Sequence, residues 1–240
     1  MNQMNNFMAL SALRAELKQY ASKQRAHICQ RFFKTKKGEY GEGDIFLGLS
    51  VPQQRKIAKK YQILPLTDIV KLLRSKIHEE RFTALVLMVT KYQKGDSDTK
   101  KQIFESYLSN TKWINNWDLV DTSTPQIVGD YLYNFGDIKI LDKLAKSNLL
   151  WDRRIAMLAT LTFIRKNEFK PVIKISKILL NDKHDLINKA VGWMLRELGK
   201  KDINLLHTFL DENSTKMPRT ALRYAIEKLP HNERNKYLAK

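Results

Sequence analysis

The sequence predicts an all-α protein built from consecutive pairs of helices. Only nine glycines and six prolines occur among the 240 residues, so few positions interrupt a regular backbone. Apolar residues recur at the 3.6-residue period of a helix over long stretches, and the two-residue alternation of a β-strand is nearly absent. These observations favour helices joined by loops over any fold that contains a sheet.

The apolar spacing places the helices along the chain in order. Two prolines refine their bounds: Pro52 suits the first turn of the helix that starts there, and Pro125 is expected to bend or restart the helix around it. The expected helices lie near 7–22, 24–33, 52–61, 66–75, 79–93, 97–109, 116–133, 138–146, 152–167, 171–180, 184–199, 202–212, 217–228 and 231–238.

A degenerate repeat of helix pairs runs through much of the chain. The pairs begin near His78, Asn115, Trp151, His184 and Met217, at steps of 37, 36, 33 and 33 residues. This period is typical of an α-solenoid of HEAT-like two-helix repeats, in which stacking of the pairs makes one continuous core and a concave face. We therefore expect residues 1–240 to form a single domain with a concave basic groove.

One stretch, from Lys34 to Ser50, breaks the helical pattern. It holds four of the nine glycines, and glycine permits backbone angles that other residues avoid. A loop that cradles phosphate is conceivable, but Glu39, Glu42 and Asp44 would repel an anion and no Gly-Lys-Ser/Thr follows. The composition therefore favours a structured turn or loop.

The charge of the chain points to a polyanionic partner. Lysine and arginine number 43 against 25 for aspartate and glutamate, which gives a formal charge of +18. Nucleic acid is the first candidate for a surplus of this size, and an anionic membrane surface is the second. The alternative is that the basic charge only keeps the protein soluble.

Nothing in the chain indicates export or a membrane span. Cys29 is the only cysteine, so no disulfide can form within the chain. The first residues lack the basic region and apolar core of a signal peptide, and the apolar run Ala84–Val89 is far too short to cross a bilayer. We expect a cytoplasmic protein that does not act at a membrane.

The segment 115–130 holds an unusual pair of residues. Trp117 and Asp121 are four apart, so on a helix they share one face, whereas Asp118 points elsewhere. A carboxylate beside an indole on such a stripe needs a reason. From this segment alone, a core tryptophan with Asp121 capping a neighbouring helix is favoured over a functional pair, because caps are common.

Two later helices carry further candidates. Arg154 lies within an apolar stripe, where a guanidinium either pairs with a carboxylate of a neighbouring helix or reaches an anion, and the two alternatives are evenly balanced. Gly192 inside a helix would let another backbone or a ligand approach beside Trp193, although core packing is the more common reason for such a pair.

The sequence contains no metal-binding, nucleotide-binding or nucleophile motif. The five histidines are scattered, and the two that start expected helices, His78 and His184, suit surface or capping roles better than metal binding. We therefore expect no metal and no cofactor.

Taken together, five segments resemble the DNA alkylation repair family of HEAT-like DNA glycosylases, the AlkD type. They read KGEYGEGD followed by VPQQR, then NWDLVD, then WDRRIA, then KAVGWMLRE, in that order and over nearly the whole chain. The resemblance implies an α-solenoid that wraps around double-stranded DNA and excises positively charged N3- and N7-alkylated purines, such as 3-methyladenine and 7-methylguanine, while the lesion stays stacked.

The resemblance also implies which residues act. The catalytic pair falls on Asp121 and Trp117, and the DNA-binding residues fall on Arg154 and Trp193. Their neighbours Arg153 and Lys189 are expected to contact the DNA as well.

No lysine is an obvious nucleophile, so we expect base excision without strand cleavage, by a monomer. The alternatives are a non-catalytic HEAT-like binder of duplex or branched DNA, and a protein-binding scaffold, which would not need a charge of +18.

Overall fold

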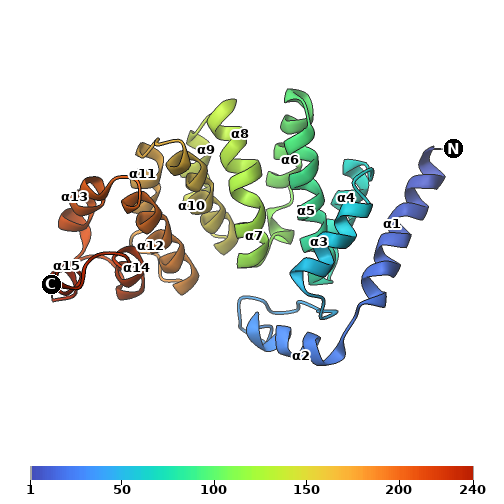
Figure 1. The fold of residues 1–240 in the computed structure, drawn as a ribbon, viewed down its shortest axis with the longest axis horizontal. Helices are drawn as coiled ribbons and strands as arrows, with labels where there is room; N and C mark the ends of the chain where they lie inside the picture. Colours follow the sequence, from blue (N-terminus) through green and yellow to red (C-terminus); the bar gives the residue numbers. More distant parts are fainter. Residues whose placement is uncertain (1, 240) are drawn as a thin grey trace. The chain divides into compact units, whose positions relative to one another are not determined.

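The computed structural model describes residues 2–239, and their side chains from residue 8 onward. Over these residues the chain is helical without a strand, and an isolated parallel bridge joins Ile45 to Ile77. The helices form two compact units, one up to Ser123 and one from Thr124 (Figure 1). The predicted all-α class is confirmed.

The first unit consists of three helix pairs and one further helix. Each pair lies where the apolar spacing predicts it, although the first helix begins at Asn2 rather than near residue 7. The helices are α1 (Asn2–Gln19), α2 (Lys23–Phe32), α3 (Val51–Lys60), α4 (Leu66–Leu73), α5 (His78–Lys94), α6 (Ser97–Leu108) and α7 (Trp117–Thr124).

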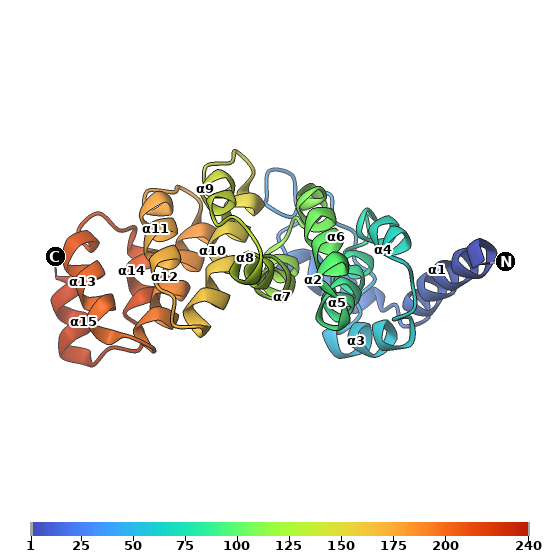
Figure 2. The ribbon, with the colours of Figure 1, turned by 90° about the horizontal axis from the view of Figure 1, so that it is seen from above.

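Helix α5 is the centre of the first unit. It packs against α3, α4 and α6, and Figure 2 shows α3 and α4 beside it. It is buried along nearly its whole length, including charged residues of its first turn. Helix α3 starts with the capping box of Ser50 and Gln53, and Pro52 lies in its first turn as expected.

The glycine-rich stretch is a structured loop held by its own carboxylates. Gly38, Gly43 and Gly48 adopt positive φ angles that other residues rarely reach. Glu42 accepts a hydrogen bond from the amide of Gly38, and Glu39 accepts one from the amide of residue 36. Acidic side chains bind these amides, and the prediction that the stretch forms a structured loop is confirmed.

The second unit continues with further helix pairs. The expected helix 116–133 is divided here, because a turn of π-helix from Pro125 to Gly129 separates α7 from α8. The remaining helices are α8 (Asp130–Asn134), α9 (Lys139–Ala145), α10 (Leu150–Arg165), α11 (Lys170–Leu179), α12 (Asp185–Gly199), α13 (Ile203–Asn213), α14 (Arg219–Ala225) and α15 (His231–Leu238).

The first helices of successive pairs stack on one another in the second unit. Helix α10 packs against α12, and α12 packs against α14, while α9 and α11 form a second layer against α10 (Figure 1). Gly192 permits the closest of these contacts. A Cβ there would collide with the carbonyl oxygen of Ala221 and lie 2.5 Å from the Cβ of Tyr224. Its role is therefore core packing, and the stacking is that of HEAT-like repeats.

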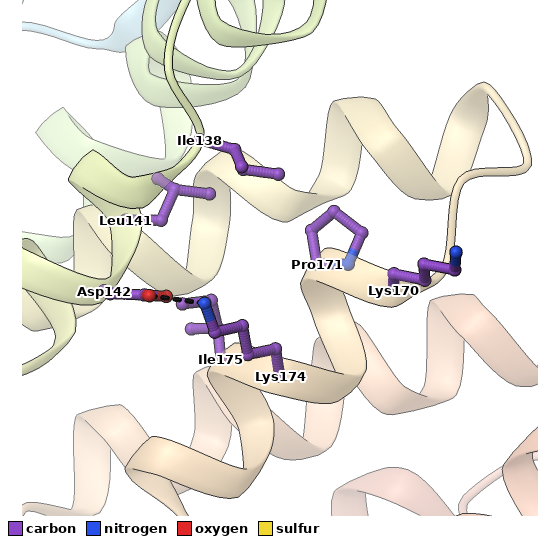
Figure 3. A pocket seen from close by; sticks show the side chains of 7 residues that line it. All are labelled: Ile138, Leu141, Asp142, Lys170, Pro171, Lys174 and Ile175. Carbon is purple, nitrogen blue, oxygen red and sulfur yellow. Dashed lines mark hydrogen bonds and ion pairs between the residues drawn. The ribbon is translucent and has the colours of Figure 1, made fainter.

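A small apolar pocket lies between α9 and α11 (Figure 3). Its volume is about 130 Å³, and Lys174 from α11 pairs with Asp142 from α9 at its edge. The other residues that line it are Ile138, Leu141, Lys170, Pro171 and Ile175. None of the candidate residues for chemistry lies among them.

Candidate functional site

Helix α7 places Trp117 and Asp121 one turn apart, and both are half-buried. The buried Asn116 starts the helix, because its side-chain oxygen accepts a hydrogen bond from the amide of Trp117 at 2.8 Å. The two predicted catalytic residues therefore share one helix face, as the four-residue spacing requires.

The opposite side of α7 anchors this face. Leu119 and Val120 are fully buried, and the hydroxyl groups of Ser123 and Tyr107 lie 2.9 Å apart, which ties α7 to α6. A helix held by two core residues and a buried hydrogen bond keeps Trp117 and Asp121 at a fixed orientation within the first unit.

Aromatic rings from the end of α2 brace Trp117. Its ring stacks on Phe33 with centroids 5.4 Å apart, and the edge of Phe32 lies at 5.9 Å. Phe32 is 62% exposed. An indole that is supported by one ring and borders an exposed second ring is only partly a core residue, so the burial does not favour the simple core-tryptophan alternative.

Asp118, the residue after Trp117, binds a buried histidine. The Oδ2 atom of Asp118 lies 2.8 Å from Nε2 of His78, and Oδ2 of Asp44 lies 3.1 Å from Nδ1 of the same ring. Arg81 completes the cluster through an ion pair of 2.7 Å with Asp44. The expected surface or capping role of His78 is wrong, whereas His184 does cap α12 by accepting from the amide of residue 186.

The pKa of His78 reflects two opposed causes. Burial by itself lowers the pKa of the ring, but the charge and hydrogen bond of Asp118, with the hydrogen bond of Asp44, outweigh it and raise the pKa to about 9. The pKa of Asp44 is lowered: burial acts to raise it, but His78 and Arg81 together outweigh that effect. His78 is therefore a cation at neutral pH.

The neighbouring Glu79 holds the end of the glycine-rich loop. Its buried carboxylate accepts hydrogen bonds from the amides of Leu47, Gly48 and Leu49 at 2.9, 2.7 and 3.3 Å. A carboxylate that accepts three backbone donors makes strong, charge-assisted bonds. The loop is thereby fixed to α5 right beside the histidine cluster.

In the second unit, Arg154 lies within an apolar stripe as predicted. It is 5% exposed, flanked by Trp151 and Leu158, which are also buried. Its Nη1 atom donates to the carbonyl oxygen of Leu186 at 2.5 Å, so it ties α10 to the first turn of α12. The side chain of Arg154 is almost fully buried, and its contact with DNA stays a prediction.

Arg153 and Lys189, the other two residues predicted to contact DNA, differ in how tightly their side chains are held by the protein. Arg153 pairs with Asp182 at 2.6 Å and also donates to two carbonyl oxygens of the loop before α10. This engagement favours a structural role for Arg153. Lys189 pairs with Asp185 on the surface of α12, and such an exposed pair is weak enough to give way to a phosphate. Both contacts stay predictions.

Trp193 is half-buried on α12, and its indole Nε1 donates to Glu197 at 3.2 Å. The neighbouring Gly192 packs against α14, so its small size is explained by that helix contact. Trp193 thus has one polar partner and a partly exposed ring, which suits contact with a ligand surface.

Two further observations bear on the class of site. Among residues 2–239, no group of three or more histidine, cysteine or acidic side chains is arranged to hold a metal ion. Over the same described part of the chain, no helix is both long and apolar enough to span a bilayer.

Comparisons with known proteins give a family match and a structural match. The model of a family described as "DNA alkylation repair enzyme" matches residues 13–229. A solved structure, a predicted DNA alkylation repair enzyme from Enterococcus faecalis, superposes with a TM-score of 0.68 at 16% identity, covering 88% of this chain and 97% of that one. At that identity the superposition shows a shared fold. No curated protein matches the chain.

Proposed function

The chain belongs to the DNA alkylation repair enzyme family, and on this premise we propose that it is a DNA glycosylase for N3- and N7-alkylated purines in duplex DNA. The observation that carries the proposal is the pair on α7, a half-buried carboxylate one turn from a half-buried, ring-supported indole. The charge of +18 supports a DNA substrate.

The chemistry of the lesion explains why a carboxylate is needed. Alkylation at N3 or N7 makes the purine cationic, so it leaves readily with the electron pair of its bond to C1′ of the sugar. The sugar is left with oxocarbenium character, which a fixed negative charge stabilises. We assign this role to Asp121, which also orients the attacking water and takes its proton.

We assign the contacts with DNA to two tryptophans and an arginine. Trp117 packs on the cationic nucleotide with its π face, an interaction worth about 1 kcal/mol where the ring is partly exposed. In the second unit, Trp193 packs on the DNA backbone and Arg154 contacts a phosphate. Excision without strand cleavage leaves an abasic site as the product.

The test is release of 7-methylguanine and 3-methyladenine from methylated duplex DNA. We expect release by the wild type, a loss of about a hundredfold or more in Asp121→Asn with duplex binding kept, and an intact strand until alkali is added. Asp98→Asn is the matched control, because it removes an equal charge from an exposed position in the first turn of α6. Its rate should equal that of the wild type.

One outcome would overturn the proposed activity, and another would overturn the role assigned to Asp121. Tight duplex binding by the wild type with no released base would favour a non-catalytic DNA binder. Full activity of Asp121→Asn would keep the glycosylase but remove Asp121 from its mechanism.

A further inference from the structure

A buried imidazole links the glycine-rich loop to the helix of the proposed catalytic pair. His78 is 2% exposed, and each of its two ring nitrogens lies within hydrogen-bond distance of a carboxylate oxygen. A carboxylate only accepts, so a ring that satisfies both of them donates from both nitrogens and is the imidazolium ion. The Nη2 atom of Arg81, which only donates, also lies 3.4 Å from Nδ1 of His78, but the shorter contact of 3.1 Å with Asp44 and the raised pKa of His78 favour the protonated ring.

The two carboxylates come from different parts of the first unit. Asp44 lies in the glycine-rich loop, and it has a second cation in Arg81. Asp118 is the second residue of α7, and among the described residues its only ion pair is with His78. The carboxylate of Asp118, which is next to Trp117 in the chain, is therefore neutralised by His78.

A second route leads from the imidazolium to Trp117 through aromatic rings. Phe33 contacts the imidazole at 5.0 Å and stacks on the indole at 5.4 Å. Phe46 stacks on both His78 and Phe33, with ring centroids 4.5 and 5.1 Å away, respectively. A cation against ring faces is favourable in a desolvated site, so the charge also holds the rings that brace Trp117.

We propose that His78 is a positioning residue for the glycosylase reaction: by binding Asp118 and Asp44 together it fixes the orientation of Trp117. The inference rests on the proposed function above. His78 does not touch the substrate, because its side chain is 3% exposed. It acts through the start of α7 and through Phe33.

The experiment labels the protein with 5-fluorotryptophan and records its four fluorine resonances, with that of Trp117 assigned by its loss in Trp117→Phe. In His78→Gln we expect the resonance of Trp117 to broaden or split, because the ring samples more than one orientation. The resonances of the tryptophans in the second unit should keep their widths.

The kinetic arm uses single-turnover excision together with the Kd for duplex DNA. A misplaced group costs about tenfold to a hundredfold in rate, so His78→Gln should slow excision by that factor with Kd changed less than about threefold. Adding Asp118→Asn to His78→Gln should recover part of the rate, because it removes the uncompensated charge and restores a neutral hydrogen bond.

His207→Gln is the matched control, because His207 is a partly buried histidine of the second unit that pairs with Glu233 and Tyr237. It should leave both the Trp117 resonance and the excision rate unchanged. If His78→Gln does not fold, Asp118→Asn cuts the same link between α7 and the histidine while it leaves the ion pair of Asp44 with Arg81 in place, and the same broadening is expected.

A single sharp Trp117 resonance of wild-type width in folded His78→Gln would overturn the proposal. So would a slow double variant that gains nothing over His78→Gln. If the wild type excises no base, the proposed glycosylase fails, while the fluorine spectra still decide whether His78 positions Trp117.

Discussion

Raising the pH from about 6 to about 10 should remove the charge of His78 and destabilise the first unit. The pKa of His78 is about 9 in the folded chain, whereas the ordinary value of 6.5 applies after unfolding. A group with a raised folded pKa contributes stability that is complete below the unfolded pKa and is lost as the pH rises through the folded pKa. The loss should therefore fall between about pH 6.5 and about pH 9.

The magnitude follows from the same two values. A pKa of about 9 against 6.5 corresponds to about 3 kcal/mol, and screening by solvent is small because the ring is nearly fully buried. That is a large share of the roughly 5–15 kcal/mol that holds a domain folded. The alkaline form should thus unfold at a much lower urea concentration.

The assay is urea unfolding across this pH range, followed by the fluorine resonance of Trp117 so that the first unit is observed directly. The free energy of unfolding is compared between the wild type and His78→Gln at each pH. Lysines and tyrosines that titrate in the same pH range contribute equally to both proteins, so the difference reports on the histidine. The difference should be largest at about pH 6 and shrink by about 3 kcal/mol toward pH 10. A difference in unfolding free energy between the two proteins that stays constant over this pH range would refute the reasoning.

Three other outcomes are expected. Glu79→Ala should destabilise the first unit by about 2–3 kcal/mol in urea unfolding, because the amides of the loop around Gly48 lose a buried acceptor, and a cost near zero would refute this. Gly192→Ala should destabilise the second unit by about 1–3 kcal/mol, because the new Cβ meets the carbonyl of Ala221, and unchanged stability would contradict that contact. Duplex affinity should fall with salt at a logarithmic slope of about −0.9 per phosphate contact, and a flat salt dependence would argue against a basic DNA surface.

The helices could be predicted from the sequence because their causes are local. The spacing of apolar residues indicates where each helix lies. Pro125 indicates where the expected helix 116–133 is interrupted, and the π turn begins at this residue. Glycines of the loop 34–50 signal its turns, and Ser50 and Gln53 signal the helix start that follows. The concave basic groove and the single domain stay predictions.

The histidine cluster could not be predicted, because its causes are distant. The partners of His78 lie 34 and 40 residues away, and nothing beside it in sequence distinguishes it from His184, which does cap a helix. The available signal was Asp44 within the glycine-rich loop, since a carboxylate that becomes buried there needs a cationic or hydrogen-bonding partner.

The cluster also bears on which aspartate of α7 performs chemistry. Asp118 and Asp121 are three residues apart, and either could stabilise a developing positive charge on sequence grounds alone. Asp118 already faces an imidazolium at 2.8 Å, and a carboxylate neutralised at that distance offers a cationic sugar little further attraction. This agrees with the proposal that Asp121 performs the chemistry, while Asp118 acts together with His78. The rate loss in Asp118→Asn should then be smaller than that in Asp121→Asn, and a double-mutant cycle should show coupling to His78 for Asp118 but not for Asp121.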